Sequence, residues 1–279
     1  MFEKLPNEYM TELYCEFDKN RKATSKERIL FDQQGFLVIN NFFTDNECEA
    51  IITAFQDSIK YSEKEFYRIK SNSPEQNRFT KSGFVVNPLM NLHLENDTNI
   101  SDPFLKLFNS NKAKSFISSF DNREFELYKT MYFESNRGTE QHFDSLIFKQ
   151  QQRMLGVWVA LEDISPKNGG FFVYPRTHKL LQPGYFSEEI DTLFGKYRIL
   201  SSMKQENYES QNSSQMLCIY KEGKETLELI LEKIKSSRFG PELKKGDAIL
   251  FDGNILHGSF RPESFDSSRN STSAHYLTK

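Results

Sequence analysis

Residues 156–179 read GVWVALEDISPKNGGFFVYPRTHK, and this segment indicates two buried strands joined by a turn. Its beginning belongs to the apolar run MLGVWVAL at 154–161, which is bounded by polar residues and is typical of a buried strand. Asn168-Gly169-Gly170 is a turn signal, and residues 171–174 are apolar again. The pattern therefore predicts β structure in the middle of the chain.

Further strand candidates lie on the C-terminal side at 248–251, 255–260 and 273–277, and one precedes the segment at 124–133. The N-terminal part is mostly helical. Residues 6–34 place Tyr9, Leu13 and Phe17 on one helical face, and a second helix is predicted over 102–119. Thr44 and Glu47 form a capping box that opens a helix through about residue 59, after a short strand at 36–39.

This order predicts an α+β, mainly β fold that forms a single domain over residues 1–279. The helical part covers 1–120, and the strand-rich core covers about 124–279. An insertion at about 179–243 interrupts the core and contains a helix candidate at 224–236, whereas residues 71–81 predict a loop. The 26 phenylalanines favour a packed core over disorder.

Composition excludes several classes of partner. The net charge is −3 with acids and bases interspersed, so no basic stripe indicates a nucleic-acid surface. No run of 18 apolar residues predicts a membrane span, and the first residues contain no apolar segment typical of a signal peptide. The three cysteines are far apart, which favours reduced thiols and a cytoplasmic protein.

One triplet indicates a metal site. His142 and Asp144 are two positions apart, so on a strand their side chains point to the same face. His257, next to another strand candidate, can supply a third ligand. Two imidazoles and one carboxylate form the facial triad that holds non-haem Fe(II) and leaves coordination positions open.

The remaining histidines have other interpretations. His93 lies in a polar loop and is not expected to be a ligand, and His178 is expected to make a structural hydrogen bond. His275 lies in the last strand and can face either side. Asp252 precedes His257 by an odd offset, which places it on the opposite face of a regular strand.

Four segments, in this order, are similar to the phytanoyl-CoA dioxygenase family of Fe(II)- and 2-oxoglutarate-dependent oxygenases. They are EQHFDS at 140–145, GVWVALEDISPKNGGFFVYPRTHK at 156–179, KKGDAILFDGNILHGS at 244–259 and RNSTSAHY at 269–276. DQQGFLVINNFFTDNE at 32–47 also resembles the first strand and helix of the family. The resemblance implies a double-stranded β-helix, a cupin-like jelly-roll barrel, with N-terminal and inserted helices.

The resemblance also implies the chemistry of a dioxygenase that uses Fe(II), 2-oxoglutarate and O₂, usually to hydroxylate a C–H bond. It implies that His142, Asp144 and His257 bind the iron. Arg269 matches the arginine that pairs with the distal carboxylate of 2-oxoglutarate, which a planar guanidinium can bind through two parallel hydrogen bonds. Ser259 matches a hydroxyl that helps to hold the same carboxylate.

Two more positions are implied as cosubstrate contacts, and each has a structural alternative. Lys129 matches a contacting position but also fits an exposed strand lysine. Trp158 lines or backs the cosubstrate pocket, or else simply packs in the core. The spacing from His257 to Arg269 is slightly longer than is usual in the family, so Arg261 is a rival anchor for 2-oxoglutarate.

The retained Asp144 favours hydroxylation, because related halogenases lack this carboxylate and place a halide in its position. Two alternatives stay open. One is a metal-binding jelly-roll enzyme that does not use 2-oxoglutarate, against which Arg269 and Ser259 argue. The other is a catalytically silent binding protein, against which the intact triad argues.

The expected substrate is a small polar metabolite or biosynthetic intermediate. A fatty acyl-CoA is less favoured, because the chain ends in Leu-Thr-Lys without a peroxisomal signal. Parts of 65–95 and 180–240 are expected to form the pocket wall, since substrate-binding residues concentrate in loops. Arg78, Lys81 and Arg176 are candidates to bind an anionic group, or are simply solvated cations.

Overall fold

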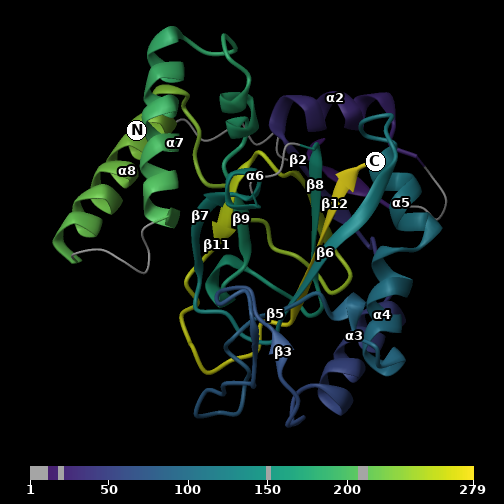
Figure 1. Ribbon diagram of the computed structural model, residues 1–279. Coiled ribbons are helices and arrows are strands. Elements are labelled where there is room, and N and C mark those ends of the chain that lie inside the picture. Colours follow the sequence, from purple (N-terminus) through teal and green to yellow (C-terminus); the bar gives the residue numbers. More distant parts are fainter. Residues whose placement is uncertain (1–11, 18–21, 149–151, 207–212) are drawn as a thin grey trace.

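The computed structural model describes residues 12–17, 22–148, 152–206 and 213–279, and two β-sheets form its centre (Figure 1). The large sheet consists of β1 (Tyr14–Glu16), β2 (Phe36–Asn40), β5 (Leu89–Met90), β6 (Phe125–Phe133), β8 (Met154–Ala160), β10 (Ala248–Asp252) and β12 (Ser271–Thr278). The small sheet consists of β7 (Thr139–Phe143), β9 (Phe171–Val173) and β11 (Leu256–Ser259). Their strand orders are β1-β2-β10-β8-β12-β6-β5 and β7-β11-β9.

The two sheets pack face to face through aromatic side chains. Trp158 of β8 stacks on Phe171 of β9 with ring centroids 5.6 Å apart, and Phe251 of β10 lies 5.2 Å from the same ring. The central strands β8 and β10 are buried along their whole length, which explains their continuous apolar sequence. The strands predicted at 36–39, 124–133, 154–161, 171–174, 248–251, 255–260 and 273–277 are confirmed, with ends shifted by one or two residues.

The predicted helix over 6–34 is wrong in its middle. Residues Tyr14–Glu16 form β1, which pairs in parallel with β2, and Tyr9 lies outside the described residues. The exposed–buried–exposed pattern of β1 has the period of a strand. The helix begins only at α2 (Ser25–Gln34), where Thr24 and Glu27 form a capping box, and ends at Gly35 with a φ of 84°.

Three helices cover the outer face of the large sheet. They are α3 (Asp45–Ser58), α4 (Thr98–Phe108) and α5 (Asn111–Ser118). The capping box of Thr44 and Glu47 is confirmed at the start of α3. The helix predicted over 102–119 is two helices, because Ser110 leaves the helical conformation and its hydroxyl caps α5. Tyr132 of β6 stacks on Phe55 of α3 at 4.4 Å, which fixes this layer to the sheet.

The insertion forms a helical hairpin against the small sheet. Its helices are α7 (Glu188–Glu206) and α8 (Ser213–Lys233), so the helix predicted at 224–236 begins earlier and a second helix accompanies it. Buried residues of the hairpin pack with Phe143, Phe172 and Leu256, the outward side chains of β7, β9 and β11. The hairpin therefore covers the face opposite to the large sheet (Figure 1).

Short elements complete the described chain. The strand β3 (Phe66–Tyr67) precedes the predicted loop at 71–81 and pairs with β4 (Pro74–Glu75), which lies inside it. Helix α6 (Asp144–Phe148) follows β7 directly. The 3₁₀ turns are η1 (Leu92–Leu94), η2 (Pro166–Asn168) and η3 (Thr177–Leu181). None of the helices in the described parts of the chain has both the length and the apolar composition that a membrane span requires.

Candidate metal centre

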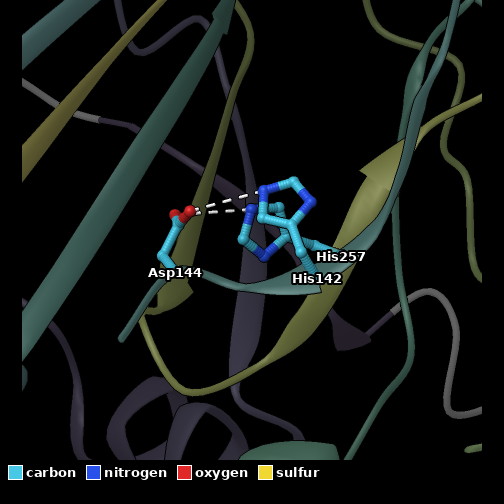
Figure 2. A group of neighbouring side chains, drawn as sticks. All are labelled: His142, Asp144 and His257. Atoms are coloured by element: carbon cyan, nitrogen blue, oxygen red, sulfur yellow. Dashed lines mark ion pairs between the residues drawn. The ribbon is translucent and has the colours of Figure 1, made fainter. Parts of the chain in front are cut away.

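The three predicted metal ligands converge between the two sheets. His142 of β7 and His257 of β11 are register partners across an antiparallel pair, and their ring centroids lie 4.4 Å apart. Each Nε2 lies 3.4 Å from a carboxylate oxygen of Asp144 (Figure 2). One ligand atom from each residue lies within 4.8 Å of the others, which is a spacing suited to a shared ion.

Asp144 reaches this point by a different path than strand alternation predicts. The strand ends at Phe143, and Asp144 is the first residue of α6. The backbone N–H of Ser145 donates to the carbonyl of Gly253 at 3.0 Å and anchors this change of direction. The structure therefore brings His142 and Asp144 together, although only His142 lies on the strand.

Backbone hydrogen bonds set the tautomers of both histidines. The Nδ1–H of His142 donates to the carbonyl of Glu140 at 2.7 Å, and that of His257 donates to the carbonyl of Ile255 at 3.0 Å. Each Nε2 then carries a lone pair in place of a proton, which is the form that binds a metal ion. Both rings are thereby oriented as ligands without any contribution from an ion.

The electrostatic surroundings favour the ligand forms of these groups. Burial lowers the pKa of His257, and the opposing attraction of Asp144 does not fully restore it, so the neutral imidazole is favoured. Burial alone would raise the pKa of Asp144, but attraction by the protonated forms of His257 and His275 outweighs burial and holds the pKa well below its usual range. A neutral imidazole and an ionised carboxylate are the forms that coordinate metals.

A buried cation lies further along the same interior. Arg269 is 2% exposed. A row of aromatic rings connects it to the ligands, because His257 stacks on Phe171 at 5.2 Å and Phe171 stacks on Trp158 at 5.6 Å. The guanidinium of Arg269 lies 5.5 Å from the ring centroid of Trp158. Its Nη1 donates to the hydroxyl of Ser271 at 2.8 Å. Among the described residues its buried Nε has no hydrogen-bond partner.

Burial lowers the pKa of Arg269 to about 9, and the nearby Glu162 only partly opposes this shift. A desolvated guanidinium with an unpaired N–H is costly unless an anion joins it. The site therefore combines a donor set suited to Fe(II) with a buried cation suited to a carboxylate.

The phytanoyl-CoA dioxygenase (PhyH) family model matches residues 31–271. The chain belongs to the phytanoyl-CoA dioxygenase family. Membership places it among the Fe(II)- and 2-oxoglutarate-dependent oxygenases, whose cofactor and cosubstrates are Fe(II), 2-oxoglutarate and O₂. No curated protein sequence is similar enough to match the chain.

Solved structures of this class share the fold at low identity. EctD from S. alaskensis with 2-oxoglutarate and 5-hydroxyectoine is 16% identical with a TM-score of 0.59, over 94% of this chain and 79% of that one. The carbocyclase SnoK from nogalamycin biosynthesis is 12% identical with a TM-score of 0.60, over 94% and 86%. The epimerase SnoN from the same biosynthesis is 15% identical with a TM-score of 0.57, over 90% and 81%. The predicted jelly-roll fold with added helices is thus confirmed.

The other residues that the family resemblance implies also face this interior. Ser259 accepts a hydrogen bond from the side-chain amide of Asn136 at 2.8 Å. The ammonium of Lys129 lies 3.8 Å from the ring centroid of Phe148, and burial lowers its pKa while Asp144 opposes that shift. Lys129 is therefore not an ordinary exposed strand lysine. Trp158 is 4% exposed and lies between the metal ligands and Arg269.

Several other candidates lie elsewhere. Arg261 is exposed, with its guanidinium 4.9 Å from the ring of Phe265. His178 makes the expected structural hydrogen bond, because its Nε2 donates to the carbonyl of Asp32 at 2.8 Å. Asp252 is buried and pairs with Arg153, away from the ligand group.

His93 differs from expectation in being buried, and its Nδ1 lies 2.9 Å from the hydroxyl of Thr130. Two candidate anion binders have protein partners: Arg78 pairs with Glu75 at 3.3 Å, and Arg176 donates to the carbonyl of Ile234 at 3.1 Å. Lys81 is exposed.

One contact of the site was not predicted. His275 of β12 faces the interior, and its Nε2 lies 2.7 Å from Oδ2 of Asp144. The sequence left both faces of the last strand open, because alternation shows which residues share a face but not which face is inside. In the structure, His275 pairs with Lys129 of β6 and with Gly156 of β8, and this strand pairing determines that its side chain faces the interior.

Proposed function

We propose that this chain hydroxylates a C–H bond of a small polar metabolite or biosynthetic intermediate. The observation that carries the proposal is the pairing of a preset His–Asp–His group with a buried, incompletely paired arginine. We further propose that residues 1–279 act as one oxygenase domain. In support, the hairpin α7–α8 packs directly on the sheet that carries His142 and His257.

In this proposal His142, Asp144 and His257 hold the iron. When bound there, iron and 2-oxoglutarate would supply the oxidising chemistry: O₂ would be reduced as one of its oxygen atoms goes to the substrate and the other to succinate, formed from 2-oxoglutarate with loss of CO₂. The contribution of the chain is orientation and exclusion of water. Phe171 and Phe251 lie 5.2 and 4.8 Å from the ring of His257 and form an apolar wall beside it.

Arg269 is proposed to bind the distal carboxylate of 2-oxoglutarate. Its burial and its unpaired Nε support this role over Arg261, which is exposed. Ser259 is proposed to donate a further hydrogen bond, Trp158 to form the wall of the pocket, and Lys129 to contribute positive charge near Asp144. The carboxylate of Asp144 supports hydroxylation over halogenation, because it occupies the position that a halide would need.

Similar solved structures support a small-molecule substrate. EctD was solved with 5-hydroxyectoine and SnoN with a nogalamycin compound. The hairpin of the insertion covers the outside of the small sheet, away from the metal ligands. Of the two predicted segments, residues 65–95 are therefore proposed to form the substrate-binding wall. Exchange of that segment is expected to change substrate choice and to preserve iron binding.

Succinate formation tests the proposal. The purified chain with Fe(II), O₂ and 2-oxoglutarate should form succinate slowly without substrate and faster with the correct metabolite in a screen. His142→Ala should abolish iron-dependent turnover, whereas His178→Gln, at a buried histidine outside the ligand group, should retain it.

Two results would contradict the proposal. Metal binding without any 2-oxoglutarate-dependent thermal shift or succinate would indicate a jelly-roll enzyme of another chemistry. Failure to bind Fe(II) at all would indicate a silent binding protein.

A further inference from the structure

His275 makes a contact that the iron-binding role of the site does not by itself require. It lies in β12 and is 1% exposed, and its Nε2 is 2.7 Å from Oδ2 of Asp144. A carboxylate oxygen at this distance accepts a hydrogen bond, so Nε2 must carry the proton. Within the described part of the chain, its Nδ1 is buried and has no hydrogen-bond partner.

This tautomer is opposite to that of the two histidine ligands. His142 and His257 donate through Nδ1 to backbone carbonyls and present the lone pair of Nε2. His275 presents N–H to the same carboxylate from a third direction. Its ring is held edge-on by Phe148 at 5.4 Å and by Phe251 at 6.0 Å.

We infer that His275 is a positioning residue for Asp144. Each carboxylate oxygen lies 3.4 Å from the Nε2 of one ligand, Oδ1 from His142 and Oδ2 from His257, but only Oδ2 also accepts the Nε2–H of His275. That hydrogen bond holds Oδ2, so that the carboxylate presents Oδ1 to the metal. This inference rests on the proposed metal site at His142, Asp144 and His257 and goes beyond it, because it assigns the orientation of one ligand to a residue outside the ligand group.

The physical reason is the freedom of a carboxylate. A carboxylate can bind a cation through one oxygen or through both, and the second mode uses an additional coordination position. An oxygen engaged by a short, charge-assisted hydrogen bond is a weaker ligand for the metal. His275 thereby keeps open the positions that a facial triad reserves for other ligands.

Two substitutions of His275 by amide side chains of different length distinguish a hydrogen-bonding role from simple packing. In His275→Gln the amide nitrogen can reach about as far as Nε2, so the donor to Oδ2 is retained. In His275→Asn the amide has similar polarity but is too short. His275→Ala is a second variant without the donor, in case Asn disturbs the fold of β12.

The experiment measures Co(II) binding by the full chain without 2-oxoglutarate, together with the visible Co(II) spectrum and the melting temperature of the metal-free protein. We expect His275→Asn and His275→Ala to bind Co(II) about 10- to 100-fold more weakly than wild type, with shifted visible bands. His275→Gln should restore both the affinity and the spectrum.

His178 provides the matched control. It is also buried, donates through Nε2 and has an unpaired Nδ1 among the described residues, but its acceptor is the carbonyl of Asp32. His178→Gln and His178→Asn should leave the Co(II) affinity and spectrum unchanged, whatever they do to the melting temperature.

The outcomes are distinct. Wild-type affinity and bands in both donor-free variants would overturn the inference and leave the metal site intact. Equal loss in the Gln, Asn and Ala variants would overturn it too, because it would indicate His275 as a direct ligand or as part of the packing. Absence of Co(II) binding in the wild type would overturn the proposed metal site, and this inference with it.

Discussion

Arg269 shows at the scale of one residue how a binding function can be inferred from incomplete pairing. A buried guanidinium normally has its donors satisfied, since each unmet hydrogen bond of a buried charged group is costly. Here one hydroxyl and two aromatic faces, those of Phe133 and Trp158, are the contacts, and Nε is unpaired among the described residues. The incomplete pairing of its Nε supports the proposed role of Arg269 as an anchor for a carboxylate.

Replacing Arg269 with methionine keeps the length of the side chain and removes the charge. We expect Arg269→Met to weaken 2-oxoglutarate binding by at least about 10-fold, because hydrogen bonds to a charged partner are lost. The rise in melting temperature caused by 2-oxoglutarate should disappear, while the rise caused by Co(II) remains.

Arg261→Met is the control for this experiment. Its guanidinium is exposed, so both thermal shifts should persist. The reverse pattern, in which only Arg261→Met abolishes the response to 2-oxoglutarate, would assign the anchor to Arg261.

The residues of the site were predicted to different extents. The pair His142 and Asp144 was visible as a spacing, His257 was a candidate third ligand beside a strand, and family resemblance supplied Arg269. The sequence placed His275 in the last strand but did not predict which face of the sheet its side chain occupies, because that face depends on which strands flank β12. That pairing joins residues far apart in the chain and includes an irregularity between His275 and Tyr276.

At the scale of the elements, Gly156 determines how β8 packs against the site. A Cβ at this position would lie 2.1 Å from Cζ of Phe251. The missing side chain makes room for the ring of Phe251, which in turn lies 4.8 Å from His257. One strand thereby supplies space, and its neighbour supplies the apolar wall.

Gly156→Ala tests this arrangement. The added methyl group must displace Phe251 toward the ligands, so we expect the free energy of unfolding to fall by about 1–3 kcal/mol, as for other overpacked cores. Co(II) affinity should fall as well. Urea denaturation and Co(II) titration measure the two effects.

Gly195→Ala in α7 is the matched control, because no atom lies within 4 Å of a Cβ at that position. It should leave Co(II) binding unchanged and, as a helix-favouring substitution, stabilise the protein by up to about 1 kcal/mol. Equal effects of the two substitutions would contradict the packing role of Gly156.

The elements themselves were predictable where a local signal was strong. The capping box at Thr44 fixes the start of α3, and turn residues delimit β8 and β9. The strand β1 was mistaken for part of a helix, because Leu13 and Phe17 fit both periods and its pairing with β2 is not local. The helix α7 was missed because its sequence has little segregation of apolar from polar residues.

At the scale of the whole molecule, burial of histidines links stability to pH. The pKa values of His93, His178 and His257 are all lowered, chiefly by burial. The unfolded chain therefore binds more protons than the folded chain below the ordinary histidine pKa. The free energy of unfolding is then largest above pH 6.5, the ordinary histidine pKa, and falls as the pH drops below it.

His93 allows this effect to be measured away from the metal site. Its pKa is lowered to about 4, so at pH 5 this histidine is protonated in the unfolded chain and still neutral in the folded one. The free energy of unfolding should therefore be about 2 kcal/mol lower at pH 5 than at pH 7.5. His93→Asn keeps a polar atom near the hydroxyl of Thr130 and does not titrate.

Urea denaturation of the metal-free proteins at pH 7.5 and pH 5 provides the measurement. The wild type should lose about 2 kcal/mol more than His93→Asn between the two conditions. A loss of the same size in both proteins would show that His93 does not contribute to acid sensitivity.

The pairing of His142 with His257 has a consequence for folding during synthesis of the chain. The two residues are 115 positions apart, and β11 must insert between β7 and β9 before their rings meet. A chain emerging from the ribosome exposes its N-terminal part first. His142 and Asp144 are therefore made well before His257, and the group of three side chains is incomplete until then. A half-made chain lacks the complete donor set. If these residues hold the iron as proposed, the full donor set forms only when the sheets are completed, and unfinished chains offer no complete site to a redox-active ion.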